Sequence, residues 1–152
     1  MLREYKLIID SREKAPLWGN TIVRTMKTGD YSIELDGESH EDRISIERKS
    51  PSDLFGTLGK GHKRFKAELE RALLLDYFAI VVEGSYTSCY NKDFPGAEFS
   101  KMRGYVITSI IFTIHIKYDI PIFFTNGRYE SKRIIKELFN AYVKNLEVPK
   151  DG

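Results

Sequence analysis

The chain contains 152 residues with a net charge of +2, and 41% hydrophobic and 30% charged residues describe a single soluble globular domain. Its one cysteine, Cys89, excludes an internal disulfide framework and a cysteine-based zinc site. The longest apolar tract, residues 105–116, is too short and too interrupted to span a bilayer, and the first residues lack the apolar region of a signal peptide, so we expect an intracellular location.

The first half of the chain predicts strands. Residues 5–10 form an apolar run that ends in an acidic residue, and residues 21–26 predict a second strand. Residues 30–35 and 43–49 alternate polar and apolar side chains, which is the period-2 pattern of half-buried strands. The apolar set points into a core and the polar set points to the opposite face. The turn signal Asp36-Gly37 between them indicates an antiparallel hairpin.

The second half alternates helices with strands. Ser50, Pro51 and Asp53 have the pattern of a helix start, so we expect a short helix that continues over residues 54–58. An amphipathic helix is expected over residues 62–77 and a final helix over residues 130–146. Residues 100–116 predict an apolar helix, although their β-branched content leaves a strand open. With strands at residues 78–83 and 121–125, this order predicts an α/β fold with a mixed sheet, in one domain of residues 1–152.

The hairpin brings chemistry-bearing side chains together. If it is centred on its loop, Asp30 falls opposite Glu47, and Lys49 follows on the same face. Opposed residues have Cβ atoms roughly 5 Å apart, so both carboxylates could share one Mg²⁺, which keeps several waters of its own. Such a cation neutralises phosphate and activates water, and the lysine orients that water. From these residues alone, the alternative is an ordinary solvated hairpin face, where Glu and Lys pairs are common.

Two basic clusters are candidates for contacts with DNA phosphates. The first adjoins the predicted site and consists of Lys60, His62, Lys63, Arg64 and Lys66. The second lies in the last predicted helix and consists of Arg128, Lys132, Arg133 and Lys136. A solvated helix face is the alternative for each, and we favour that alternative for the second cluster.

Several motifs occur in a characteristic order. The run from Glu47 to Asp53 reads E-R-K-x-x-x-D, residues 29–31 read G-D-Y, and residues 10–13 read D-x-R-E. Arg64-Phe65 with Glu68, and Val-Val-Glu-Gly at residues 81–84, come later. In order and spacing, over about residues 5–124, the chain resembles the nuclease domain of the XPF-family (ERCC4-type) structure-specific endonucleases.

This resemblance implies a restriction-endonuclease-like fold of the PD-(D/E)XK type, with a central mixed sheet and helices on both faces. It implies an endonuclease for branched, flap or fork DNA that uses Mg²⁺, or Mn²⁺ as a substitute. The implied catalytic residues are Asp30, Glu47, Lys49, Asp10, Arg12 and Asp53.

The individual residues have alternatives. We expect the backbone carbonyl of Arg48 to be a third metal ligand, and its side chain to pair with a carboxylate on the other face. Without the resemblance, Asp10 and Arg12 form a loop-anchoring ion pair. Asp53 either supports the site or caps its helix, and Arg64 with Glu68 forms either a helical ion pair or a support near phosphate.

The partners and the extent of the protein are further expectations. No tandem helix-hairpin-helix domain is present, so the chain is either an excised catalytic domain or a minimal family member. Family members commonly pair, and we expect a homodimer or heterodimer through the C-terminal helices, using Ile110, Ile111, Phe112, Ile114, Ile116, Phe139, Tyr142 and Val143. The alternative functions are a non-catalytic DNA-binding or dimerisation module and a nuclease that cuts intact duplex DNA.

Overall fold

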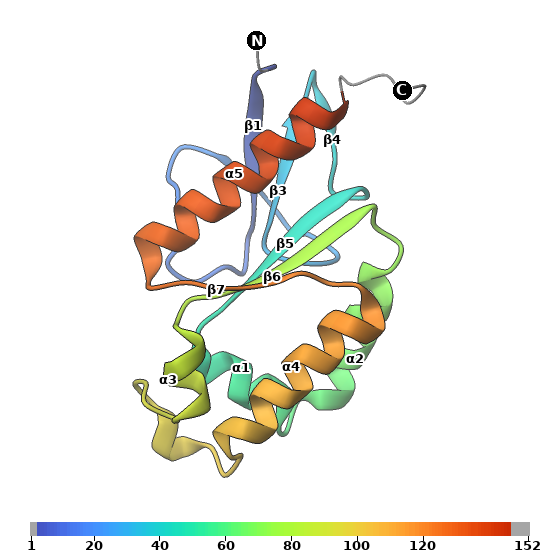
Figure 1. Cartoon of the computed structure of the whole chain (residues 1–152). Helices are drawn as coiled ribbons and strands as arrows, with labels where there is room; N and C mark the ends of the chain where they lie inside the picture. Colours follow the sequence, from blue (N-terminus) through green and yellow to red (C-terminus); the bar gives the residue numbers. More distant parts are fainter. Residues whose placement is uncertain (1–2, 147–152) are drawn as a thin grey trace.

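The computed structural model describes residues 3–146. Within them, seven strands form one mixed sheet in the order β2-β1-β3-β5-β6-β7, and β4 pairs with the edge of β3 (Figure 1). The strands are β1 (Tyr5–Asp10), β2 (Ile22–Arg24), β3 (Tyr31–Leu35), β4 (Glu38–Ser39), β5 (Ile44–Lys49), β6 (Tyr77–Val82) and β7 (Ile122–Phe124). β3 runs antiparallel to both β1 and β5, whereas β5, β6 and β7 are parallel to one another.

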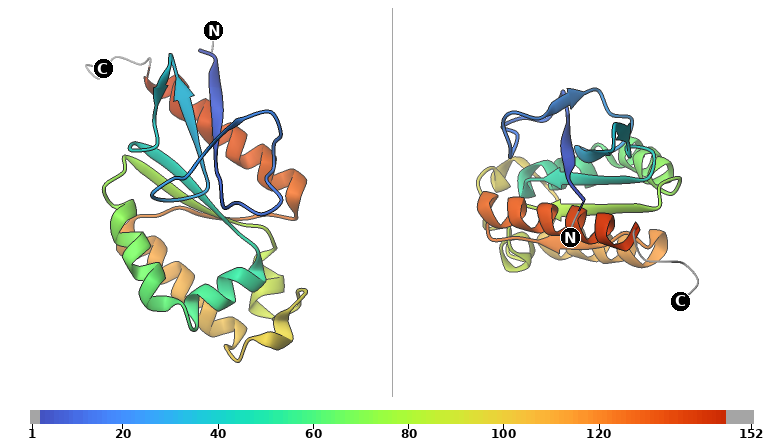
Figure 2. Two further views of the ribbon diagram at one scale, coloured as in Figure 1. Left: turned by 180° about the vertical axis from the view of Figure 1, so that it is seen from behind. Right: turned by 90° about the horizontal axis from the view of Figure 1, so that it is seen from above.

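Helices cover both faces of this sheet, as Figures 1 and 2 show. One face carries α5 (Arg128–Leu146), and the other carries α1 (Pro51–Leu58), α2 (His62–Ala72) and α4 (Gly104–Tyr118). A short helix, α3 (Tyr86–Tyr90), and a 3₁₀ helix, η1 (Ala97–Phe99), lie in the connection between β6 and α4. The predicted α/β fold with a mixed sheet between two helical layers is therefore confirmed.

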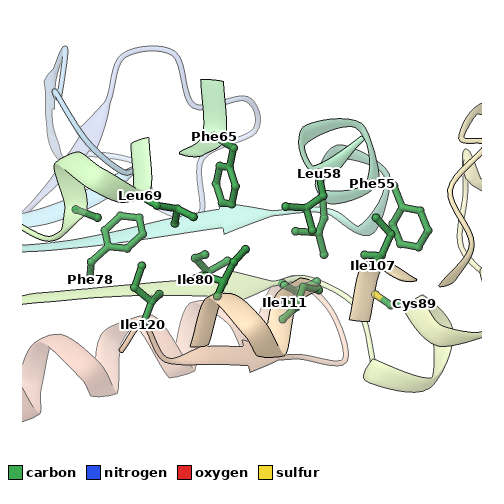
Figure 3. Close-up of a cluster of buried hydrophobic side chains, with 14 residues drawn as sticks. Phe55, Leu58, Phe65, Leu69, Phe78, Ile80, Cys89, Ile107, Ile111 and Ile120 are labelled. Carbon is green, nitrogen blue, oxygen red and sulfur yellow. The ribbon is translucent and has the colours of Figure 1, made fainter. Parts of the chain in front are cut away.

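Each helical layer has its own hydrophobic core. Below the sheet, α1, α2 and α4 pack on β6 through buried side chains that include Phe55, Phe65, Ile80 and Ile111 (Figure 3). On the other face, α5 packs Ile135, Phe139 and Val143 against β1, β3 and β5. Alternate residues of the central strands thus enter different cores, which is why these strands are buried on both sides.

Part of the predicted dimer surface belongs to these cores. Ile111, Ile114, Phe139 and Val143 are at most 6% exposed, so their assignment to an interface was wrong. The Tyr142 hydroxyl lies 2.6 Å from Nδ1 of His40. Only Phe112 and Ile116 of the predicted set are clearly exposed.

The middle of the polar face of the hairpin is also buried, so the interpretation of this face as an ordinary solvated surface is wrong there. Ser32 and Ser45 have no exposed surface and Glu47 is 5% exposed. The two serine hydroxyls donate to backbone carbonyls, from Ser32 to Ile44 and from Ser45 to Thr28, each at 2.7 Å. These hydrogen bonds satisfy the two buried hydroxyls beneath the α1–α2 layer. They thereby avoid the loss of stability that an unpaired buried hydroxyl would cause.

Some element boundaries differ from the prediction. The amphipathic helix ends at Ala72 rather than residue 77, because Tyr77 must already pair with Ile44 as the first residue of β6. The apolar segment is a helix, as predicted, but begins at Gly104. The Asp36-Gly37 turn exists, with positive φ at both residues, and joins β3 to the short strand β4.

Residues 147–152, part of the C-terminal stretch predicted to lack a helix-hairpin-helix signal, lie outside the described residues. Within residues 3–146, no helix is both long enough and apolar enough to cross a membrane.

Candidate active site

Asp30 and Glu47 meet at the beginning of the β3–β5 pairing. Tyr31 pairs with Ile46, so the next residues outward are Asp30 and Glu47, which confirms the predicted register. Gly29 makes this entry to β3 feasible, with φ of +79° and space so tight that an added Cβ would lie 2.0 Å from Oγ of Ser45. Only glycine fits such a position, which explains the glycine in the G-D-Y motif.

The backbone of β5 orients the Asp30 carboxylate. The Arg48 amide donates to Oδ2 of Asp30 at 2.7 Å. The neighbouring Lys49 carbonyl instead accepts from the Glu83 amide, on the β6 side. Because backbone groups alternate along a strand, the amide and the carbonyl of Arg48 both face the β3 side. The carbonyl predicted as a third metal ligand thus lies on the same edge of β5 as Asp30.

The carboxylates of this site resist ionisation. The pKa of Asp30 is raised to about 6, mainly by burial and to a smaller extent by the charge of Glu13, while the hydrogen bond from the Arg48 amide opposes both effects. Burial also raises the pKa of Glu47 well above its usual range, with added contributions from the charge of Asp30 and from Glu68. The Nζ atom of Lys49, 3.7 Å from Oε1 of Glu47, acts in the opposite direction. A divalent cation between the two carboxylates would relieve this repulsion.

Glu68 is a third acidic residue at the site. It comes from α2, and its hydrogen-bonding interaction and negative charge both act on Glu47. The sequence offered one signal for it, since Glu68 lies one turn after Phe65 and next to Leu69, both buried on the inner face of α2. Of the two interpretations made for Glu68, the helical ion pair and the supporting role, the position beside Glu47 favours the second.

The site opens into a groove made of two connected cavities. The first, of about 280 Å³, is lined by Asp30, Glu47 and Lys49 and by Arg12 from the loop after β1. The second, of about 390 Å³, runs between α1 and α2 and is lined by residues that include Arg64 and Glu68. Lys49 and Asp53 line both cavities, so the two parts of the groove adjoin at these residues.

Asp10 and Arg12 have different positions relative to this groove. Asp10 is 4% exposed and accepts hydrogen bonds from the Met26 amide at 2.8 Å and from the Arg12 guanidinium at 3.0 and 3.1 Å. Arg12 itself is exposed and lines the first cavity. Asp10 therefore acts on the site by holding Arg12 in place, as a loop-anchoring ion pair would.

The Arg48 side chain points away from Glu47 and Lys49, as predicted. Its guanidinium donates to Glu83 at 2.9 and 3.1 Å and lies 3.5 Å from Glu13. Burial alone would raise the pKa of Glu83, but hydrogen bonds from Arg48 and Ser131 and the positive charge of Arg48 lower it below the usual range. This ion pair ties β5 to the end of β6 beneath the site.

Asp53 lies in the first turn of α1, but the cap of this helix is Ser50. The Asp53 amide donates to Oγ of Ser50 at 3.1 Å, and Asp53 lines both cavities of the groove. A supporting role of Asp53 at the site stays a prediction.

The first basic cluster does not form one surface. Arg64 alone among its five members lines the groove beside Lys49. Lys60 lines a neighbouring cavity beyond α1, and His62 and Lys66 line a groove between α2 and α4. Lys63 is exposed. Helical geometry explains this separation, because successive residues of α2 point in directions about 100° apart.

The donor set of the site suits a hard cation. Among residues 3–146, no group of three or more His, Cys, Asp or Glu side chains is arranged to hold a metal ion. Asp30 and Glu47 supply carboxylate oxygens from two strands, and the Arg48 carbonyl lies on the same edge of β5 as Asp30. Two carboxylates with one carbonyl fit Mg²⁺, which retains several of its waters, better than they fit zinc.

Comparisons with known proteins agree with this architecture. The profile of the ERCC4 domain matches residues 6–138. A putative ATP-dependent RNA helicase from Methanocaldococcus jannaschii is 26% identical over 135 residues, which are 86% of this chain but 15% of that protein.

Two solved structures share the fold. XPF from Aeropyrum pernix superimposes with a TM-score of 0.69 at 19% identity, over 96% of this chain and 66% of that one. XPF from Aeropyrum pernix in complex with DNA gives 0.66 at 19% identity, over 97% and 69%. Since the profile covers most of the residues and the motifs lie together in one groove, the chain belongs to the ERCC4 domain family.

Proposed function

We propose that this domain is a divalent-metal-dependent endonuclease that hydrolyses phosphodiester bonds of DNA. The observation that carries the proposal is the meeting of Asp30, Glu47 and Lys49 in one groove of an ERCC4 domain. DNA is the favoured substrate because XPF from Aeropyrum pernix, a structure of the same fold, has been solved with DNA. The raised carboxylate pKa values add support, since perturbed titration is characteristic of catalytic sites.

The side chains divide the chemistry among them. A bound Mg²⁺ would neutralise the phosphate and lower the pKa of its water. Asp30 and Glu47, with the Arg48 carbonyl, would hold that ion, and the Arg48 amide keeps Asp30 in position. Lys49 lies where it can orient the attacking water and stabilise charge that develops on the phosphate. Arg12 and Arg64, on the walls of the groove, are placed to bind neighbouring phosphates.

The preferred substrate is branched, flap or fork DNA. This part of the proposal rests on the XPF-type motifs. Two alternatives differ in their outcome: a nuclease for intact duplex would cut linear DNA as well as forks, and a non-catalytic module would bind DNA and cut neither.

The test is a cleavage assay with Mg²⁺ or Mn²⁺ over single-stranded, duplex, flap and fork DNA. Asp30→Asn and Glu47→Gln should each reduce the rate by about 100-fold or more, as expected for loss of a group that stabilises the transition state. Asp42→Asn, in an exposed turn of the hairpin, is the matched control and should cut normally. Normal cleavage by the Asp30 and Glu47 variants would overturn the assignment of the site.

We further propose that two copies pair through the outer face of α4. Phe112 and Ile116 on this face are 48% and 80% exposed, and Tyr86 of α3 contacts Phe112 and the Phe124 ring of β7. A contiguous exposed aromatic surface of this kind is characteristic of protein interfaces. The dimer is expected from the family resemblance, and its partner is a second copy or a related chain.

A further inference from the structure

An aromatic cavity lies beside the groove of the proposed nuclease site. It has a volume of about 450 Å³ and is formed by α1 and by the segment between α3 and α4, which lies beside α1 (Figure 2). Phe99, the last residue of η1, lines it and is 86% exposed, the highest exposure among the large hydrophobic side chains described. This volume falls within the usual range of sites for small organic groups.

The segment that carries Phe99 is firmly held. Gly96 has φ of +89°, and a Cβ there would lie 2.9 Å from Oγ of Ser52, so the segment packs closely on α1. Oγ of Ser100 accepts from the Met102 amide at 3.1 Å, and the Lys92 ammonium donates to the Ser100 carbonyl. Phe99 therefore stays exposed to water on a well-anchored backbone, although burial of so large an apolar ring would be favourable.

The cavity adjoins the catalytic groove across α1 and is basic. Ser52 and Gly56 of α1 line both this cavity and the part of the groove beside Lys49. Lys60 and Lys101 are the charged residues of its described lining, which includes no carboxylate. An anion with an apolar flat surface would match this combination of a phenyl ring and two ammonium groups.

We infer that this cavity binds an unpaired nucleotide of the DNA, with its base stacked on Phe99 and its phosphates near Lys60 and Lys101. The inference rests on the proposed function for the identity of the polymer, and it adds that the strand leaving the cut site is single-stranded there. Base stacking on an aromatic ring combined with basic side chains is the usual way of binding single strands without sequence preference.

Other occupants fit less well. In a duplex both faces of each base are already stacked, so Phe99 could reach a base face only by unstacking neighbouring bases, which is unfavourable. An apolar protein segment would cover Phe99 but would place two lysines without counter-charge at the edge of the interface. The charge and the ring together therefore favour a single-stranded nucleic acid.

The test measures binding without divalent metal, so that no DNA is cut. Fluorescent single-stranded, flap and duplex DNA would be titrated with wild type, Phe99→Ala, Phe99→Trp and Lys101→Ala. Leu74→Ala is the matched control, because Leu74 is 83% exposed and lines none of the cavities described here.

Phe99→Ala should weaken binding to single-stranded and flap DNA by about 5- to 150-fold, with little change for duplex, and Phe99→Trp should restore binding. Lys101→Ala should weaken the same complexes and reduce their log–log salt slope by about 0.7. Because Phe99 is exposed, all variants should keep the wild-type melting temperature.

Three results would overturn the inference: unchanged single-strand binding by Phe99→Ala, an equal loss for single-stranded and duplex DNA, or an altered oligomeric state with unchanged DNA binding. A failure of the proposed function can be distinguished from a failure of this inference. If wild type cuts no DNA with Mn²⁺ but binds single strands through Phe99, the binding site stands without the nuclease.

Discussion

The Arg48 amide donates a hydrogen bond of 2.7 Å to Oδ2 of Asp30, so that β5 supplies both Glu47 and the group that orients its partner carboxylate. One residue of β5 thereby has two functions on two faces. Its backbone serves the site, and its guanidinium pairs with Glu83 on the opposite side of the sheet. Damage to the site can therefore come from changes that leave both carboxylates in place.

The first such change is Gly29→Ala. The new Cβ would lie 2.0 Å from Oγ of Ser45 in a backbone with φ of +79°. We expect a loss of stability of about 1–3 kcal/mol and reduced cleavage, because the turn that presents Asp30 must move. Gly37→Ala is the matched control: its φ is +78° but nothing lies within 4 Å, so only the backbone cost applies. Thermal unfolding of both variants tests this expectation. Equal losses of stability in the two variants would show that the contact with Ser45 is unimportant.

The site carboxylates should destabilise the metal-free protein at neutral pH. The folded pKa of Asp30, about 6, lies above its ordinary value of 3.8, so between these values the folded state holds a proton that the unfolded state has lost. The contribution of Asp30 to stability therefore falls as pH rises through this window. The difference between these two pKa values corresponds to about 3 kcal/mol, which solvent in the open cavity reduces to about 1 kcal/mol.

Asp30→Asn should therefore raise the neutral-pH melting temperature of the metal-free protein by about 2–4 °C and have little effect at a pH near 4. Added Mn²⁺ should stabilise wild type but not the variant, because a cation binds only the ionised folded site. Calorimetry with and without metal would test both effects, and an Asp30→Asn variant less stable than wild type at neutral pH would contradict them.

Neutralising Glu68 should shift the pH dependence of the site. The charge of Glu68 raises the pKa of Glu47, so Glu68→Gln lets Glu47 ionise at lower pH. We expect the acid limb of the cleavage profile, and the onset of Mn²⁺ binding, to move toward lower pH. Glu70→Gln, at an exposed position of the same helix, should leave the profile unchanged. If both variants behave alike, Glu68 does not act through Glu47.

The ion pair of Arg48 and Glu83 should be important for stability. The two side chains are 11% and 18% exposed, with two hydrogen bonds between them. Arg48→Ala leaves the half-buried Glu83 carboxylate without its main partner, and we expect a cost of about 1–3 kcal/mol, below that of breaking a fully buried pair. A double-mutant cycle with Glu83→Ala isolates the pairing, and additive losses in urea unfolding would mean that the two side chains are not coupled.

The proposed dimer depends on Phe112. Phe112→Asp places a charge in the exposed aromatic face of α3 and α4 and should shift the protein toward monomer, with a dissociation constant raised by about tenfold or more. Leu74→Asp, an equally radical change at another exposed apolar residue, should not. Sedimentation at micromolar concentration measures the oligomeric state of both variants. A wild-type protein that is already monomeric would contradict the proposed dimer.

The sequence by itself was sufficient for the local features of this protein. The register of Asp30 with Glu47 followed from alternation along two strands, and the α1 cap at Ser50 followed from its Ser-Pro-x-Asp pattern. Both depend on residues within one hairpin or one helical turn, where side-chain direction is set by strand and helix geometry.

Tertiary packing decided the rest. Glu68 reaches Glu47 only because α2 lies across β5, and the burial of Ser45 and Glu47 depends on a helical layer contributed by later residues. Similarly, Ile111 and Phe139 became core residues, and the α2 members of the first basic cluster were divided, with Arg64 in the groove and His62 and Lys66 in a separate cavity. A polar strand face has the same sequence pattern whether water or a helical layer covers it. The alternation and composition of a strand do not specify which element packs on that face.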